Sequence, residues 1–243
     1  MTLHMEPQMK KPTVSIVIPT YQHAGEIPLC LESIFEQTFT DYEVIVVNDG
    51  STDGTREVLA PYLARIDYIE QENRGGNSAR NRGFDQAKGD YILFCDADVI
   101  MRPDMLEKML VALKSHPEAS YAYSSFKFGW KKFRLWPFSG DKLRRMNYIH
   151  TTSLIRREHF PRFDEKISRL QDWDLWLTML ERGHVGFWIP EYLFQCLPHQ
   201  GGISLWVPKI FNVIPWRKLG IRMKNLEKLE EARRIMKEKH HLE

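Results

Sequence analysis

The stretch GDYILFCDADVIMRP, residues 89–103, joins a buried strand to a pair of acids. Its apolar run at 91–95 follows a Gly-Asp turn, which is typical of a strand buried on both faces. The run ends at Asp96 and Asp98, whose carboxylates repel each other unless a cation or a polar partner compensates them. A hard divalent ion that bridges to phosphate oxygens would do so. The alternative is a turn that caps a helix beginning after Pro103, since aspartate is common in turns.

The composition is that of a globular protein with one main domain and extensions. Of the 243 residues, 43% are hydrophobic and 27% are charged. A formal net charge of +2 argues against a dedicated nucleic-acid-binding protein. The three cysteines show no metal-ligand spacing and cannot all pair, which favours a reducing compartment. We expect residues 1–12 to be a flexible N-terminus; they lack the apolar core of a secretion signal, and no apolar run is long enough to span a bilayer. We therefore expect a cytoplasmic protein, soluble or peripheral at the membrane.

Strands and helices alternate through the first hundred residues. We expect strands at 13–19, 42–48, 66–71 and 91–95, and helices from Ile27, after Asp53 and over about 77–87. This alternation predicts an α/β fold with a Rossmann-like, mostly parallel central sheet flanked by helices.

Polar residues directly follow three of the predicted strands, namely Thr20-Tyr21, Asp49, and Asp96 with Asp98. Sheets of this kind bind ligands at the carboxyl ends of their strands. The three strand ends would therefore place acid-rich side chains on one rim. This convergence favours a ligand site over an isolated turn for the acid pair.

The second half predicts further elements and one ambiguous segment. We expect a helix after Pro103, strands at 121–128, 151–155, 185–189 and 192–197, and a helix from Gln171 to Gly183. Residues 129–145 mix tryptophan and phenylalanine with lysine and arginine, and we expect a mobile, exposed loop there rather than core. The alternative is a solvated loop whose aromatic side chains pack locally.

Two polar positions in this half also have purely structural explanations. Asp172 and Asp174 fall in the first turn of the predicted helix, where acids are favoured by the helix dipole. His199 precedes a Gly-Gly segment, and a lone histidine in a loop is more often solvated than ligating.

The chain ends in a basic aromatic arm and a charged helix. Residues 205–224 combine tryptophan, aliphatic and basic side chains with no acid, which suits an element lying in a membrane interface. An arm packed on the main domain explains the same composition. Residues 225–239 predict a helix that serves either packing or oligomerisation.

Five motifs occur in order along the chain. They are VSIVIPTY (14–21), VIVVNDGSTDGT (44–55), NRGGNSARNRG (73–83), GDYILFCDADV (89–99) and QDWDLW (171–176). Together they resemble the family-2 glycosyltransferases with a GT-A fold; each motif alone is weak, but their order and spacing are highly specific. The resemblance implies a GT-A domain at 13–204 with a nucleotide-sugar-binding half (13–102), an acceptor-binding half (103–204), and the arm and helix at 205–243.

The resemblance also implies an activity and a set of nucleotide contacts. The family transfers a sugar from a nucleoside diphosphate to an acceptor, usually with inversion at the anomeric carbon. The donor expected from the family is a UDP-sugar, and the acceptor is a glycan or a lipid-linked molecule. The residues implied on the nucleotide side are Pro19, Thr20 and Tyr21 for the nucleoside pocket, Asp49 for the base, Arg80 for the nucleotide and Asp96 for the ribose or the metal.

The same resemblance implies a metal and a base. Asp98 would hold Mn²⁺ or Mg²⁺ against the diphosphate, and His199 corresponds to the late histidine that family members often place on the metal or diphosphate. Asp172 occupies the position of the catalytic aspartate. The chemistry needs these groups because the leaving diphosphate develops negative charge and the acceptor hydroxyl must lose a proton.

Departures from the family pattern leave alternatives open. Gln171 stands where the family often has glutamate, and Gln22 stands where asparagine is common. The QxxRW signature of processive synthases is absent, which favours transfer of a single sugar. One alternative is a nucleotide-sugar- or glycan-binding module that has lost catalysis. A sugar nucleotidyltransferase is disfavoured because no glycine- and arginine-rich phosphate loop follows the first strand.

Overall fold

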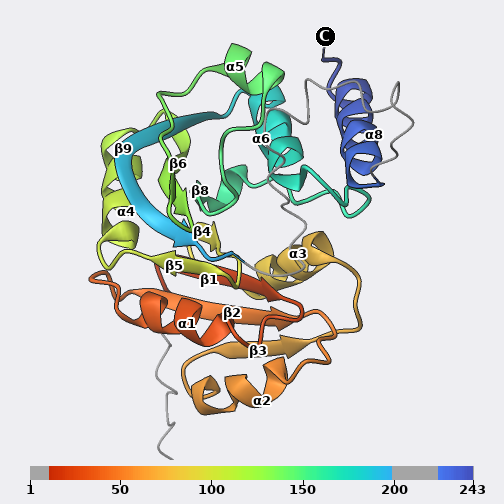
Figure 1. Cartoon of the computed structure of the whole chain (residues 1–243). Coiled ribbons are helices and arrows are strands. Elements are labelled where there is room, and N and C mark those ends of the chain that lie inside the picture. Colours follow the sequence, from red (N-terminus) through yellow and green to blue (C-terminus); the bar gives the residue numbers. More distant parts are fainter. Residues whose placement is uncertain (1–10, 199–223, 243) are drawn as a thin grey trace, which may run out of the picture.

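The computed structural model describes residues 11–198 and 224–242, which are organised around one mixed sheet (Figure 1). Its strands are β1 (Val14–Thr20), β2 (Tyr42–Asn48), β3 (Asp67–Glu70), β4 (Tyr91–Phe94), β5 (Val99–Met101), β6 (Ala119–Phe128), β7 (Lys131–Phe133), β8 (Leu154–Arg156) and β9 (Val185–Cys196). Across the sheet they follow the order β3-β2-β1-β4-β8-β6-β9-β5, and β7 pairs with β6. The predicted α/β architecture is therefore confirmed.

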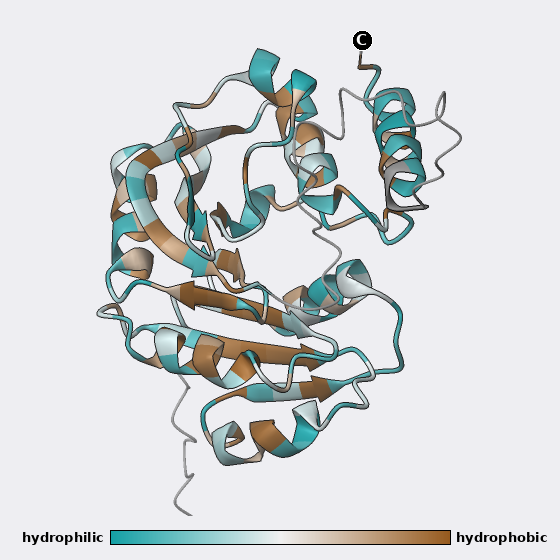
Figure 2. Cartoon of the chain, viewed as in Figure 1, coloured by the Kyte–Doolittle hydropathy of each residue, from teal (hydrophilic) through white to brown (hydrophobic). Residues whose placement is uncertain are grey.

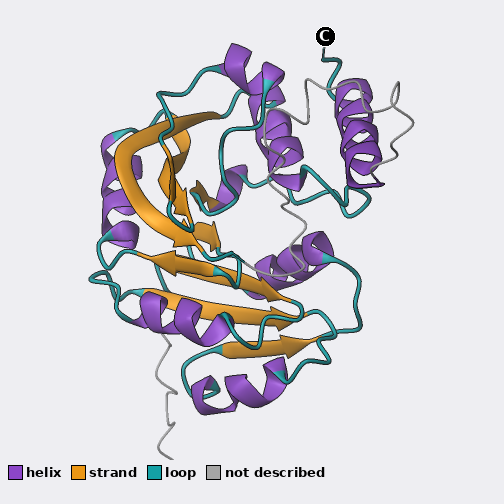
Figure 3. Ribbon diagram, viewed as in Figure 1, coloured by secondary structure: helices purple, strands orange, loops and turns teal. Residues whose placement is uncertain are grey.

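Helices cover both faces of this sheet (Figure 3). They are α1 (Ile27–Phe35), α2 (Thr55–Leu59), α3 (Gly76–Gln86), α4 (Met105–Ser115), α5 (Gly140–Arg145), α6 (Gln171–Glu181) and α8 (Lys224–Lys239), with short 3-10 turns η1 (Ala60–Tyr62) and η2 (Arg157–His159). Successive strand residues face opposite sides. In β1, Ile16 and Ile18 join the core under α1 and α4, whereas Val17 joins the core under α3 and α6. Because both faces are covered, β1 and β2 are almost continuously hydrophobic (Figure 2).

Strand pairing changes from parallel to antiparallel at β4. β1 pairs in parallel with both β2 and β4, as the alternating pattern predicts. On its other side β4 pairs antiparallel with β8, and β8 pairs antiparallel with β6. The segments that precede β8 therefore lie at the same edge of the sheet as the residues that follow β4.

Two sequence expectations for the second half are wrong. The strands expected at 185–189 and 192–197 are one strand, β9, whose pairing with β6 shifts register around Pro190 because proline cannot donate to the ladder. Residues 129–145 are not one mobile, exposed loop, since they include β7 and α5, although the turn at Trp130 is exposed. Leu135 and Leu143 are buried in the core, and Trp136 stacks on Tyr148 with ring centroids 5.1 Å apart.

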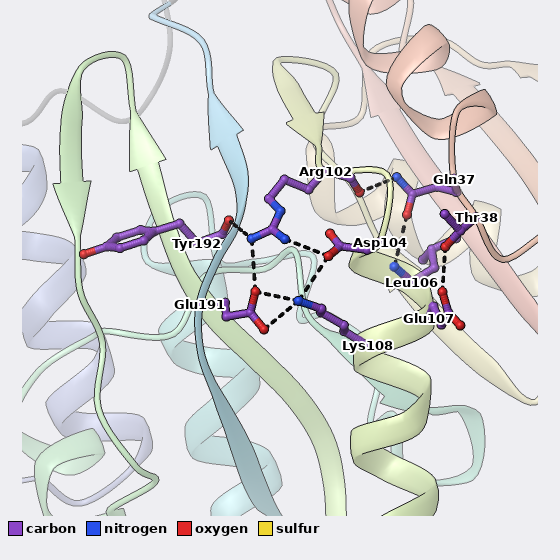
Figure 4. A network of polar contacts seen from close by, with 9 residues as sticks. All are labelled: Gln37, Thr38, Arg102, Asp104, Leu106, Glu107, Lys108, Glu191 and Tyr192. Carbon is purple, nitrogen blue, oxygen red and sulfur yellow. Dashed lines mark hydrogen bonds and ion pairs between the residues drawn. The ribbon is translucent and has the colours of Figure 1, made fainter.

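Polar contacts fasten the turn between β5 and α4 to its neighbours (Figure 4). The amide of Gln37 donates to the Arg102 carbonyl at 2.7 Å and accepts from the Leu106 backbone at 3.1 Å. On the other side, Arg102 and Lys108 form ion pairs with Glu191 of β9 at 3.1 and 2.6 Å. These charged groups are each more than a third exposed, so they contribute little to stability and mainly fix the position of the turn.

The C-terminal helix α8 packs beside α6 (Figure 1). Met236 is fully buried, and the buried His240 lies between two carboxylates of α6, 2.8 Å from Asp174 and 2.8 Å from Glu181. Lys239 adds a second ion pair to Asp174 at 2.8 Å. Both ring nitrogens of His240 can donate only when the imidazole is protonated. Within the described residues, α8 is thus a packing helix of its own chain.

We predict that Gly83→Ala destabilises the protein by about 1–3 kcal/mol, the usual effect of overpacking a core. A Cβ at this position of α3 would lie 2.3 Å from Cγ1 of Val17 and 3.2 Å from Cγ2 of Val47. Urea denaturation measures the change in the free energy of unfolding. Gly25→Ala is the matched control, because a Cβ there meets no atom within 4 Å. Equal stability of both variants would contradict this packing of α3.

We also predict a pH-dependent contribution from His240. Burial acts to lower the pKa of His240, but hydrogen bonds and charges from Asp174 and Glu181 outweigh it and raise the pKa above the usual value. The stabilisation should therefore be fully present below about pH 6.5 and be lost as the pH rises through the raised pKa. His240→Gln should lower the free energy of unfolding by about 2 kcal/mol near pH 6 and by progressively less in alkaline buffer, as measured by urea denaturation.

The exposed neighbour His241 provides the control for this experiment. His241→Gln removes an imidazole from the exposed surface and should leave the free energy of unfolding near pH 6 unchanged. A loss in His240→Gln that is constant across the pH range would contradict the ion-pair account.

Candidate active site

The rim predicted from three strand ends is present in the structure. The backbone amide of Asp49, after β2, donates to the carbonyl of Thr20 at the end of β1, at 2.9 Å. The amide of Cys95, after β4, donates to the β1 residue Val17 at 3.0 Å. Asp96 and the residues that follow the three strands therefore lie along one edge of the sheet, because all three strands are parallel neighbours.

An ion pair joins α3 to the end of β4. Nη2 of Arg80 lies 2.6 Å from Oδ1 of Asp96, and the Arg80 side chain is 7% exposed. Nη1 of Arg80 is 3.4 Å from the side-chain oxygen of Asn77. Nε of Arg80 is buried and makes no hydrogen bond to the described part of the chain. A buried donor without a partner is rare, so this nitrogen suits a ligand or an ordered water.

Arg80 also controls the charge of Asp96. Burial raises the pKa of the Asp96 carboxyl, but the positive charge and hydrogen bond of Arg80, together with His150, outweigh burial and hold that pKa below its usual value. Asp96 is therefore ionised at neutral pH. An ionised carboxylate can accept hydrogen bonds from hydroxyl groups or bind a cation.

Asp98 lies between β4 and β5, where β9 closes the side of the site. Its backbone carbonyl accepts the amide of Leu197 at 2.8 Å. The thiol of Cys196, the last residue of β9, has its pKa raised by burial and further by the charges of Asp98 and Asp96. The end of β9 and the acid pair therefore face the same space.

His150 was not recognised from the sequence and lies in this space. Burial lowers the pKa of the His150 imidazole, whereas the negative charges of Asp96 and Asp172 act to raise it. Nδ1 accepts the amide of Thr152 at 3.0 Å, which leaves Nε2 as the protonated nitrogen of the neutral ring. Nε2 lies 3.6 Å from Sγ of Cys196. His150 thus lies within electrostatic range of the carboxylates at the end of β4 and at the start of α6.

Asp172 is held at the N-terminus of α6. Its carboxylate accepts the amide of Trp173 at 2.9 Å, and it follows Leu170, which adopts the left-handed conformation with φ +59°. The indoles of Trp173 and Trp176 donate to the carbonyls of Leu143 and Ile149 at 2.6 and 2.9 Å. These contacts fix the helix against the segment that carries His150. Asp172 therefore lies partly exposed at the start of a helix that is anchored by its two tryptophans.

The predicted base-contacting residue Asp49 is engaged with the glycine loop. Its side chain accepts hydrogen bonds from Gln71 at 2.7 Å and from the backbone amides of Arg74 and Gly75 at 2.9 and 2.8 Å. Gly75 has φ +92°, a conformation that favours glycine. The geometry gives Asp49 a definite local function, which is to shape the loop that leads into α3.

The remaining predicted nucleoside residues line the end of β1. Pro19 is partly buried, Thr20 is 2% exposed with a hydroxyl that has no hydrogen-bond partner in residues 11–198 and 224–242, and Tyr21 is 46% exposed. Gln22, one departure from the family pattern, has φ +59° and binds Thr52 through both ends of its amide, at 2.7 and 3.0 Å. Gln22 therefore joins the loops after β1 and β2.

The described residues supply only part of a coordination sphere for a cation. No group of three or more His, Cys, Asp or Glu side chains between 11 and 198 or 224 and 242 is arranged to hold a metal ion. His199 lies outside the described residues, as does the arm up to residue 223. The acid pair nevertheless fits a hard cation of the kind that binds one or two carboxylates and completes its coordination with substrate phosphates and water.

The fold is similar to that of solved glycosyltransferases. S. aureus TarS 1–349 in complex with UDP-GlcNAc superposes with a TM-score of 0.67 and 18% identity, covering 89% of this chain and 69% of that one. The mannosyltransferase PcManGT from Pyrobaculum calidifontis, in complex with GDP-Man and Mn²⁺, gives a TM-score of 0.63 with 21% identity and covers 80% of this chain and 60% of that one. The chain therefore has a GT-A fold.

Sequence relatives agree with the structural ones. A chondroitin synthase of Escherichia coli is 32% identical over 185 residues, which are 71% of this chain and 27% of the relative. The chain spans between 14% and 30% of the length of the first four curated relatives that it matches. No helix within the described ranges has the length and apolarity needed to cross a bilayer. The profile described as "Glycosyl transferase family 2" matches residues 15–171, and this chain therefore belongs to glycosyltransferase family 2.

Proposed function

We propose that the chain is an inverting, metal-assisted glycosyltransferase that moves a single sugar from a UDP-sugar to a hydroxyl of a glycan or lipid-linked acceptor. The observation that carries the proposal is helix α3. Its Arg80 pairs with Asp96 at 2.6 Å. Its Asn77 binds, at 2.8 Å, the 164–167 segment that leads to Asp172. One helix therefore contacts both the end of β4 and the segment before the proposed base, which supports a shared site. Direct displacement at an anomeric carbon needs the nucleotide and the base in one site.

The nucleotide side of the proposed site is formed by residues from β1, β2, α3 and β4. The assigned residues are Pro19, Thr20 and Tyr21 at the nucleoside, Asp49 and its glycine loop at the base, Arg80 near the nucleotide, and Asp96 at the ribose or the metal. Two buried groups here, Nε of Arg80 and the hydroxyl of Thr20, have no hydrogen-bond partner among the described residues and supply donors suited to a phosphorylated ligand. TarS has been crystallised with UDP and with UDP-GlcNAc, which supports the choice of donor.

A divalent cation is proposed on Asp98, with His199 as a further ligand. The cation, when bound, would neutralise the negative charge that develops on the leaving diphosphate. Arg80 would add positive charge on the same side, since it lies 2.6 Å from Asp96 at the end of β4. PcManGT is in complex with both GDP-Man and Mn²⁺, which supports the use of a divalent cation here.

Asp172 is the proposed base. Its carboxylate takes the proton of the acceptor hydroxyl while that oxygen forms a bond to the anomeric carbon. The bond from the anomeric carbon to the diphosphate oxygen breaks, and its electron pair leaves with the diphosphate. Attack from the face opposite to the leaving group inverts the anomeric centre. The Trp173 amide, 2.9 Å from the Asp172 carboxylate, holds it in position.

The alternative function is a nucleotide-sugar- or glycan-binding module without catalysis. Gln171 in place of the frequent glutamate before Asp172 is the observation that favours it. Nucleotide binding without transfer to any of a broad panel of acceptors would support this alternative.

Two further assignments extend the proposal to the ends of the molecule. We propose that the arm at 205–224 contacts the membrane surface of the cytoplasmic side, because it combines tryptophan and basic side chains without acids. A role of the C-terminal helix in oligomerisation would have to use the surface of α8 that Met236 and His240 leave uncovered.

The proposed roles predict different defects for two substitutions. Asp172→Asn should lower kcat by at least about 10²-fold with nucleotide binding unchanged, because only proton removal is lost. Asp98→Asn should abolish transfer and also weaken Mn²⁺-dependent UDP binding by at least about tenfold. Thermal shift with UDP, GDP or dTDP in the presence of Mn²⁺ measures binding and identifies the base, since a ligand of the folded state raises Tm.

Asp67→Asn, an exposed acid at the start of β3, is the control with the same chemical change and should leave both quantities unchanged. Full transfer activity in both site variants would overturn the mechanism. Full nucleotide binding with no transfer in the unmodified chain would favour the binding module.

A further inference from the structure

A basic, aromatic hairpin extends from the sheet on the β6–β7 connection. The 126–134 hairpin, as we define it, comprises the end of β6, the turn Gly129-Trp130, β7 and Arg134. Gly129 has φ +53°, which allows the tight turn. None of the roles proposed for the glycosyltransferase site uses this hairpin.

The base of the hairpin is rigid. The Phe126 ring stacks between Phe133 of β7 and Phe194 of β9, with centroid distances of 4.9 and 5.3 Å and interplanar angles of 3° for both pairs. The amide of Gly129 donates to the carbonyl of Cys196 at 3.0 Å. The sheet therefore holds the hairpin tip in a defined position beside the end of β9.

The tip exposes a tryptophan. Trp130 is 94% exposed, whereas the next most exposed large hydrophobic side chain in the described residues is Val111 at 56%. An indole has an apolar ring and one N–H donor, and it prefers the headgroup region of a bilayer to either water or hydrocarbon.

The charges around the tip are of one sign. Lys127 and Lys132 are direct cross-strand partners, an arrangement that destabilises a ribbon unless an anion compensates it. Residues 119–140 contain four lysine or arginine residues and no aspartate or glutamate, although the whole chain has a formal net charge of only +2. The hairpin is thus a local concentration of positive charge in a nearly neutral protein.

We propose that the 126–134 hairpin docks on the surface of an anionic lipid bilayer. Trp130 would lie at headgroup depth, and Lys127, Lys132 and Arg134 would contact the anionic headgroups. A soluble polyanion would be attracted by the same lysines but gives no reason for an apolar ring at the tip. The proposal is independent of the transfer chemistry and of the arm at 205–224, and it orients the site end of β9 toward the membrane.

Vesicle co-sedimentation tests this inference with the full chain. The protein should bind mixed phosphatidylglycerol–phosphatidylcholine vesicles and bind pure phosphatidylcholine vesicles much more weakly. Lys127→Ala with Lys132→Ala should lower the partition coefficient by at least about tenfold, since each basic residue near an anionic surface contributes about fivefold. Trp130→Ala should lower it by a similar factor. Each variant is measured also with Trp206 and Trp216 replaced by alanine, which separates the hairpin from the arm.

Matched controls remove the same groups elsewhere on the surface. Lys88→Ala with Lys114→Ala removes two exposed charges, and Leu63→Ala shortens a 51% exposed side chain; both should bind vesicles like the unmodified chain. Tm should not fall in the hairpin variants, because Trp130 is exposed and the lysine pair is repulsive. Unchanged vesicle binding in the hairpin variants would overturn the proposal. Binding to a soluble anionic polysaccharide that depends on the lysines but not on Trp130, with no vesicle binding, would assign the hairpin to a glycan instead.

Discussion

The ion pair between Arg80 and Asp96 is the contact on which the site depends. Asp96 follows β4 with its side chain 29% exposed, and Arg80 on α3 is 5% exposed, so Asp96 compensates a guanidinium that is almost completely removed from water. Removing one partner of a buried pair leaves an uncompensated charge, which typically costs about 3–5 kcal/mol. The pair therefore stabilises the acid in its ionised form and fixes α3 against the rim of the sheet.

Helix α3 extends this constraint to the acceptor side. The amide of Asn77 donates to the carbonyls of Asp164 and Ile167, both at 2.8 Å, in the segment that leads to α6. Asn81, one turn later, binds the backbone of Phe163 through both its oxygen and its nitrogen. Helix α3 thus contacts Asp96 through Arg80, and it contacts the 163–167 segment that precedes Asp172 through its two asparagines. The relative position of the two proposed chemical groups is set by a single helix.

Local sequence patterns predicted the first half of the fold well. β2 was predicted to the residue, and the rim followed because parallel strands place their carboxyl ends together. Two features that the sequence patterns missed, β5 and the position of His150, have a common cause, which is long-range pairing. β5 has three residues and exists by pairing with β9, and His150 reaches the site because β8 returns antiparallel beside β4. Neither of these two pairings can be inferred from a short stretch of sequence. Had the antiparallel pairing of β8 with β4 been predicted, the residues before Leu154 would have been candidates for the site.

The antiparallel pairing of β4 with β8 has a consequence for folding during synthesis. While the nascent chain leaves the ribosome, β4 can pair with β1 as soon as residue 94 is available, but its other side waits for Leu154–Arg156. During this interval the fully buried Ile92 and Leu93 belong to an open strand edge, and such edges recruit other chains. Synthesis that stalls or terminates before β8 is thus expected to give an aggregation-prone fragment, even though that fragment holds every motif on the nucleotide side.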